Sequence, residues 1–134
     1  MTIHLFTNMI KVLIPKNTDF NYKQCKKLYK KYKKQIGDNQ EFRDIVKSTF
    51  FYSFFDEGKH IGCIYYYEKH GKLFVNAFAN RHTHETNIKC LKKTFEWFNC
   101  DIYAQTEHKT AIYCLYKCGF KKINDNTYKL EREV

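Results

Sequence analysis

The sequence predicts an α+β fold in which helices cover a mixed, mostly antiparallel central sheet. Two observations lead to this prediction. Stretches whose apolar residues alternate with period two are interleaved with stretches whose apolar residues recur at helical spacing. Their order (strand, two helices, three strands, helix, strand, helix, two strands) is not a regular strand–helix alternation, so an all-parallel sheet is not expected. The 134 residues suit one domain, and we expect a single domain over residues 1–134.

Each element rests on its own periodicity and on the residues that end it. β-favouring runs bounded by turn residues predict strands, and apolar residues three or four apart predict helices. Pro15 is placed to end the first strand, and Gly37 and Gly119 to end two helices. The predicted elements are a strand at 9–14, helices at 22–36 and 42–46, strands at 50–56, 60–68 and 72–79, a helix at 86–98, a strand at 101–105, a helix at 108–117, and strands at 120–123 and 127–130.

Three local features refine this outline. The residues up to Asn8 carry no pattern and are expected to fray. Asp38, followed three residues later by Glu41, resembles a capping box and is expected to start the second helix. The three strands between 50 and 79 are separated by short turns, so they are expected to form an antiparallel meander.

Composition limits the partners and the compartment. Twenty-four Lys and Arg against fourteen Asp and Glu give a formal charge of +10, so the surface should attract nucleic acid, acidic protein or phosphorylated cofactors. The six cysteines form no CxxC pair and follow no signal peptide, which favours reduced, mostly buried thiols in a cytoplasmic protein. The apolar runs are too short for a membrane helix, so no membrane association is expected.

The segment Lys72–Trp97 contains the sharpest change of period, from a strand directly into a helix. Between them lies a polar loop, residues 80–87, with one arginine and two histidines. A loop that leads into a helix N-terminus meets the positive end of the helix dipole. This loop is therefore a candidate anion cradle.

Several other features have both a functional and a structural interpretation. His82 and His84 have chelating spacing, but without a nearby cysteine or third histidine an exposed loop pair is favoured. Cys114 and Cys118, four apart on a helix, are better explained by buried packing than by a metal. The seven lysines within residues 23–34 form either a solvated helix surface or a contact for an anionic partner, and both interpretations stay open.

Two segments, residues 111–122 and 61–75, resemble motifs of the GCN5-related N-acetyltransferase (GNAT) family. The segment AIYCLYKCGFKK at 111–122 has the spacing of the family's late motif, and His108 stands where that motif usually has Asn. The segment IGCIYYYEKHGKLFV at 61–75 looks like the family's central hairpin, and the order of elements over 9–131 is also similar. The motif positions that match are Ala111, Ile112, Lys117, Gly119 and Phe120.

The resemblance implies an N-acetyltransferase that moves an acetyl group from acetyl-CoA, its co-substrate, to an amine of a small molecule or a protein. It places the thioester between the fourth and fifth predicted strands, with the backbone at the end of the fourth strand holding its carbonyl oxygen. It places the pyrophosphate in the loop before the following helix. The implied cofactor-binding residues are Phe78, Ala79, Arg81, His82, Thr83, His84, Glu85, Thr86, Asn87 and His108.

This chain differs from the family pattern in the pyrophosphate loop. Aligned backward from Trp97, His82 takes the position of the usual arginine, with Arg81 one residue earlier. Glu85 and Asn87 take the positions of glycines that let backbone N–H groups approach phosphate.

The acid that protonates the departing thiolate is the second difference. The family's frequent tyrosine position is occupied by Leu115, and Tyr116 follows it. A helix rotates about 100° per residue, so the two positions face different directions. Tyr116 is nevertheless the candidate catalytic acid.

The two differences from the family pattern and the formal charge of +10 support an alternative function. On this hypothesis the chain is a catalytically degenerate GNAT-fold protein, phage-encoded and working in the host cytoplasm, that binds nucleic acid or a partner protein through its basic surface. The chain is expected to be a monomer or a homodimer under either hypothesis.

Overall fold

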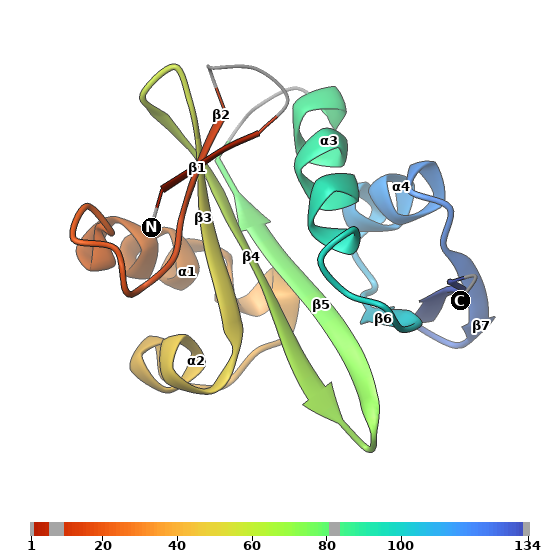
Figure 1. The fold of residues 1–134 in the computed structure, drawn as a ribbon. Coiled ribbons are helices and arrows are strands. Elements are labelled where there is room, and N and C mark those ends of the chain that lie inside the picture. Colours follow the sequence, from red (N-terminus) through yellow and green to blue (C-terminus); the bar gives the residue numbers. More distant parts are fainter. Residues whose placement is uncertain (1, 6–9, 81–83, 133–134) are drawn as a thin grey trace.

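The computed structural model describes residues 2–5, 10–80 and 84–132, which form one eight-stranded sheet with helices on both faces (Figure 1). The strand order is β1-β2-β3-β4-β5-β6-β8-β7, and every neighbouring pair is antiparallel except β5 and β6. The elements are β1 (Thr2–Leu5), β2 (Ile10–Leu13), α1 (Tyr22–Ile36), α2 (Phe42–Ser48), β3 (Phe50–Asp56), β4 (Lys59–Lys69), β5 (Lys72–Ala79), α3 (His84–Phe95), β6 (Ile102–Gln105), α4 (Lys109–Lys117), β7 (Lys121–Asn124) and β8 (Thr127–Leu130).

The predicted α+β class and the order of the other elements are confirmed, but the expectation for the N-terminus was wrong. Residues Thr2–Leu5 form β1, which pairs antiparallel with β2 at the edge of the sheet. Four residues are too few to show a clear hydrophobic period, so the pairing of their backbone with β2 could not be anticipated.

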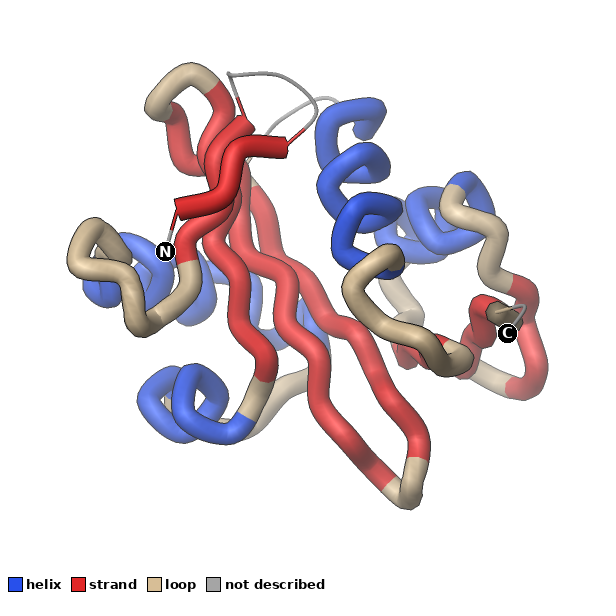
Figure 2. The backbone as a smooth tube through the Cα atoms, in the orientation of Figure 1, coloured by secondary structure: helices blue, strands red, loops and turns tan. Residues whose placement is uncertain are grey.

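The sheet, drawn in red in Figure 2, has helices on both faces, and a separate hydrophobic core packs on each face. Helices α1 and α2 cover one face, where a largely aromatic cluster includes Tyr29, Phe42, Phe51, Tyr65 and Phe78. Helices α3 and α4 cover the other face, where aliphatic residues and cysteines pack against rings. Strand β4 contributes side chains to both cores, because successive side chains of a strand point to opposite faces of the sheet.

Helix α1 has the boundaries that the sequence predicts. The Asn21 side chain accepts a hydrogen bond from the Gln24 N–H at 3.0 Å and caps the first turn. Gly37 adopts φ 68°, and its N–H donates to carbonyls of the last turn. The helix carries seven lysines and no acidic residue.

The capping box at the start of α2 was a wrong prediction. The N-cap of α2 is Glu41, and its side chain forms no capping hydrogen bond. Asp38 instead accepts the Gln40 N–H at 2.9 Å and the Tyr65 hydroxyl at 2.8 Å. The Asp38 carboxylate, which was expected to cap α2, is thus hydrogen-bonded to Tyr65 of β4 instead.

Strands β5 and β6 pair over only two residue pairs. The parallel register joins Leu73 to Ile102 and Phe74 to Tyr103, whereas β5 continues to Ala79. Figure 1 shows the two strands diverging beyond this point. The rest of β5 stays bonded to β4, so one edge of β5 faces an opening in the sheet.

Strand β4 contains one extra residue relative to β3. Phe54 pairs with Gly62 and Phe55 with His60, which leaves Ile61 as the additional residue of a β-bulge. Beside the bulge, Gly62 lies opposite Ala79, and a Cβ added there would approach the Phe78 carbonyl oxygen to 2.5 Å. Only glycine allows β4 and the end of β5 to lie this close.

No described helix is both long and apolar enough to cross a membrane.

Replacing Gly62 with Ala is expected to lower the free energy of unfolding by about 1–3 kcal/mol, because the added methyl group meets backbone atoms that cannot rotate away. Denaturant unfolding measures the change. The exposed β7 substitution Lys122→Ala serves as the control and should stay within about 0.5 kcal/mol of wild type. A Gly62→Ala protein as stable as wild type would contradict this account of the close approach.

Candidate functional site

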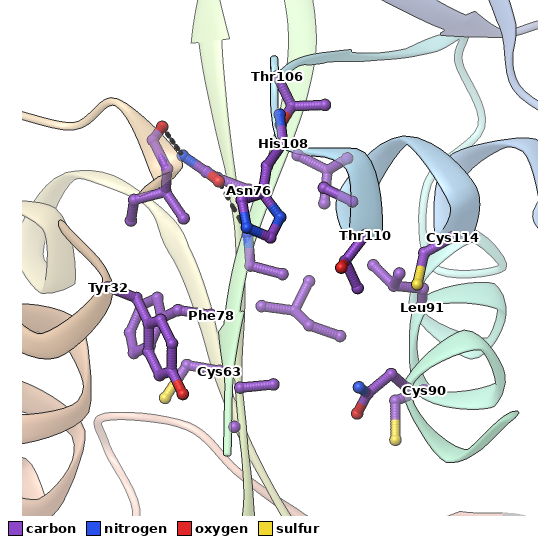
Figure 3. A pocket seen from close by; sticks show the side chains of 18 of the residues that line it. Tyr32, Cys63, Asn76, Phe78, Cys90, Leu91, Thr106, His108, Thr110 and Cys114 are labelled. Carbon is purple, nitrogen blue, oxygen red and sulfur yellow. Dashed lines mark hydrogen bonds between the residues drawn. The ribbon is translucent and has the colours of Figure 1, made fainter. Parts of the chain in front are cut away.

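The opening between β5 and β6 leads into a cavity of about 650 Å³ (Figure 3). Residues of α1, β4 and β5 form one wall, and residues of α3, β6 and α4 form the other. In Figure 3, Tyr32, Cys63 and Phe78 face Cys90 and Leu91 across the cavity. The cavity therefore exists because the two strands separate.

The backbone at the end of β5 supplies hydrogen-bond donors to this cavity. The Asn80 N–H donates to the Ile61 carbonyl of β4 at 2.7 Å. Because N–H groups alternate in direction along a strand, the N–H of Phe78 also faces β4, and those of Ala77 and Ala79 face the opening. Of the two residues predicted at this point, Ala79 is the one whose N–H has the required direction.

Asn76 connects this edge to α1. Its Oδ1 accepts the Ala77 N–H at 3.0 Å, and its Nδ2 lies 3.5 Å from the Ile36 carbonyl oxygen (Figure 3). The side chain thus occupies the donor of Ala77 and leaves Ala79 as the donor that faces the cavity.

The opposite wall contains amide and imidazole groups. Asn87 Oδ1 is buried and has no hydrogen-bond partner among the residues that the structure describes. His108 is the N-cap of α4, but its side chain forms no capping hydrogen bond. Both residues line the cavity, so both have polar atoms available to a ligand there.

The cavity wall has no permanently charged side chain among the residues that the structure describes. Within the described ranges it includes no Lys, Arg, Asp or Glu, and its titratable side chains are histidines, cysteines and Tyr32. Burial raises the pKa of Cys90 to about 12 and also raises the pKa of Cys114. These two thiols therefore stay protonated and are poor nucleophiles.

A second hollow, of about 690 Å³, adjoins the cavity on the α1 side. The two share Gln35, Ile36, Asn76, Gln105 and Thr106. Unlike the cavity, this hollow is charged. Its wall includes the carboxylates of Asp38, Glu68 and Glu107 and the amines of Lys34 and Lys69.

The structure brings together half of the ten predicted cofactor residues. Phe78, Ala79, His84, Asn87 and His108 all line the cavity. The predicted residues at 81–83 (Arg81, His82 and Thr83) lie outside the described residues.

The other two predicted cofactor residues, Glu85 and Thr86, lie in the first turn of α3 but not in the cavity wall. The Glu85 carboxylate is exposed and lies 3.5 Å from Lys89 Nζ. Its charge is directed along the helix surface and not into the cavity.

Tyr116 does not fit the predicted catalytic role. Its side chain is 53% exposed and packs edge-on against Tyr128, with ring centroids 5.7 Å apart, outside the cavity. Leu115, one residue earlier, is buried and lines the cavity instead. The 100° rotation between neighbouring helix positions explains the difference. The expected burial of Cys114 and Cys118 is confirmed.

Some residues of the site were missed by the sequence interpretation. Asn76, Gln105 and Thr106 lie where β5 and β6 diverge, and they line both the cavity and the second hollow. One signal was available for Asn76, because it is a polar residue in the middle of an apolar run of the strand, and asparagine has a poor β propensity.

Comparison with known proteins identifies the fold. No protein-family model and no curated protein sequence matches this chain. The solved structures that resemble it include ribosomal-protein-S5-alanine acetyltransferase from Vibrio fischeri, with a TM-score of 0.71 and 11% identity over 99% of this chain and 97% of that one. A GNAT-family acetyltransferase from Bacillus anthracis has a TM-score of 0.64 and 15% identity, covering 98% of each chain.

A ribosomal L7/L12 α-N-protein acetyltransferase, solved in complex with coenzyme A, has a TM-score of 0.68 and 7% identity, again covering 98% of each chain. The chain therefore has the fold of the GNAT acetyltransferases.

Proposed function

We propose that this chain, with its GNAT fold, is an acetyl-CoA-dependent N-acetyltransferase that acts on an amine. One observation carries the proposal. In a fold shared with acetyltransferases, β5 and β6 diverge around a cavity whose wall is uncharged and whose β5 edge presents a backbone donor. The pantetheine arm of acetyl-CoA is itself uncharged and rich in amides, so it suits such a wall. The free cysteines and the lack of a membrane-spanning helix among the described elements are compatible with action in the cytoplasm.

Acetyl transfer needs a donor for the oxyanion that forms when an amine attacks a thioester. The Ala79 N–H, which faces the cavity, is placed to stabilise this negative charge. A backbone donor in a buried wall needs no reorganisation during the reaction. His108 lines the same cavity at the start of α4, and we assign it the protonation of the departing thiolate in place of Tyr116.

The N-terminal end of α3 is the proposed contact for the pyrophosphate. Helix N-termini present free N–H groups and a positive dipole end, which suit phosphate. Glu85 would oppose an anion there, but its ion pair with Lys89 offsets the charge. Asn87 takes the position of a family glycine and contributes an amide to the cavity wall. Arg81 and His82, which precede α3 in the sequence and lie outside the described residues, stay in the proposal as phosphate contacts.

The acceptor is proposed to enter through the second hollow. An amine is protonated in solution, and the three carboxylates of that hollow, which outnumber its two lysines, suit an ammonium group. Glu68 lies at the exposed end of β4, where it can take the proton through water before the neutral amine reaches the cavity. A cationic amine, small or carried by a protein, is the expected acceptor.

Acetyl-CoA is expected to raise the midpoint of thermal unfolding, since a ligand at a hundred times its dissociation constant stabilises by about 2.7 kcal/mol. Ala111→Trp should abolish the shift, because Ala111 lines the cavity and the indole would fill it. Lys117→Trp places the same ring at an exposed position of the same helix and should retain the shift. If wild type shows no shift with millimolar acetyl-CoA, or if Ala111→Trp behaves as wild type, the proposed cavity is not the binding site.

Single-turnover acetyl transfer to a polyamine is expected to separate the two candidate acids. His108→Ala should lower the rate about 10²- to 10⁴-fold, the usual contribution of a general acid. Tyr116→Phe should leave the rate unchanged, because the hydroxyl lies outside the cavity. Acetyl-CoA binding, measured by calorimetry, is the control for both variants. The reverse pattern, with a slow Tyr116→Phe and a normal His108→Ala, would contradict the assignment.

A second candidate function is supported by the surface of α1. The helix has seven lysines and no acid, and none of these lysines forms an ion pair within the described part of the chain. Like charges at neighbouring helical positions repel, so an anionic partner would be stabilising. We propose nucleic acid as this partner, with or without acetyl transfer.

Duplex DNA of arbitrary sequence is expected to bind at low salt and to dissociate as salt rises, with log K falling by about 0.9 per phosphate contact for each unit of log salt. The double charge reversal Lys27→Glu with Lys30→Glu should weaken binding and reduce that slope. The reversal of Lys121 and Lys122 on β7 changes the net charge equally and is the matched control. Equal losses in the two variants would indicate a response to net charge only and would exclude α1 as a specific surface.

A further inference from the structure

A polar cluster lies inside the aromatic core between α1 and the sheet. It consists of Cys25 from α1, Ser53 from β3, and His60 and Cys63 from β4. The Ser53 hydroxyl lies 2.9 Å from His60 Nε2 and 3.4 Å from Cys25 Sγ, and Cys63 Sγ lies 3.8 Å from His60 Nε2. The two sulfurs and a ring nitrogen of His60 all lie within 4.8 Å of one another.

The β-bulge in β4 creates this cluster. His60 and Cys63 are three residues apart and would face opposite sides of a regular strand. The extra residue Ile61 shifts the register, so both side chains reach the α1 face. Ser53 is the direct cross-strand partner of Cys63 on that face. The bulge therefore brings His60 and Cys63, which are three residues apart in the sequence, to the same face of the sheet.

The burial of these groups is nearly complete. The exposed fractions are 0% for Cys25, 1% for Ser53 and Cys63, and 8% for His60. Burying polar groups among aromatic rings costs free energy unless strong interactions compensate. His60 Nδ1 is buried and has no hydrogen-bond partner in the described chain, so the cluster is only partly satisfied. The proposed acetyl transfer assigns no role to these four side chains as a group.

We infer that Cys25, His60 and Cys63 bind a zinc ion, with the Ser53 hydroxyl beside the fourth coordination position. Two thiolates and an imidazole are typical zinc ligands. At Zn–S bonds of about 2.3 Å, tetrahedral ligands lie roughly 3.7 Å apart, so the side chains need only a small inward movement.

Charge favours zinc over a monovalent ion. Two thiolates, one neutral imidazole and Zn²⁺ sum to zero, whereas Cu⁺ would leave a net negative charge in an apolar core. Uncompensated buried charge is costly, so the neutral combination is the stable one.

The site also has an access route. Cys63 lines the 650 Å³ cavity, so an ion can approach from there without unfolding α1.

The test uses untagged full-length chain purified under reducing conditions and freed of metal by a chelator. One equivalent of Zn²⁺ should bind and raise the midpoint of thermal unfolding, and chelator should reverse the rise. Cobalt titration should give thiolate-to-metal charge-transfer absorption that saturates at one equivalent and is displaced by Zn²⁺. The inference would be overturned if neither ion bound stoichiometrically. It would also be overturned if Cys25 and Cys63 stayed joined in a disulfide under these reducing conditions.

Variants identify the ligands. Cys25→Ser, Cys63→Ser and His60→Gln should each lose stoichiometric Co²⁺ binding, and circular dichroism checks that each variant folds. Cys100→Ser removes an exposed thiol and Cys118→Ser a buried thiol outside the cluster, and both should bind as wild type does. If the cluster variants do not fold, alkylation of the wild-type cysteines tests the site instead. Bound Zn²⁺ should protect two thiols, those of Cys25 and Cys63, from the alkylating reagent. The assignment would be overturned if Zn²⁺ protected no thiol from alkylation, or if Cys118→Ser were the one variant that lost Co²⁺ binding.

Discussion

The early end of the pairing between β5 and β6 is the constraint on which the candidate site depends. After Phe74 and Tyr103 the two strands separate, while β5 stays bonded to β4 as far as Ala79. An unpaired strand edge exposes hydrogen-bonding groups that water or a ligand must satisfy. Here these groups line a cavity whose other walls are α1, α3 and α4. A sheet fully paired across this point would contain no such cavity.

Two features of β4 hold the diverging edge in place. Gly62 lets β4 approach the backbone of Phe78 and Ala79 closely, which fixes the end of β5. The bulge at Ile61 directs His60 and Cys63 to the α1 face, where they meet Cys25. Because Cys63 is also the cross-strand partner of Phe78, the polar cluster and the cavity share a wall.

Local sequence was sufficient for most of the fold but for only part of the site. Helix α1 was predicted to the residue, because its apolar stripe and Gly37 agree. The bulge could not be predicted, since it depends on the pairing of two strands and not on the composition of either. Tyr116 was misplaced for a related reason: a motif gives the position in the sequence, whereas the direction of a helical side chain changes by about 100° with each residue.

The distribution of charge also follows from tertiary structure and not from composition. A net charge of +10 suggests anion binding everywhere, yet the described cavity wall contains no Lys, Arg, Asp or Glu, and the adjoining hollow contains three carboxylates against two lysines. In the acetyl transfer proposed above, the carboxylates of the hollow would attract the ammonium form of an amine from solution. The cavity would then favour the deprotonated amine, since burial disfavours charge. The basic helix α1 therefore says little about the proposed acceptor, because the carboxylates lie in the hollow beside the C-terminal end of the helix and not on the helix itself.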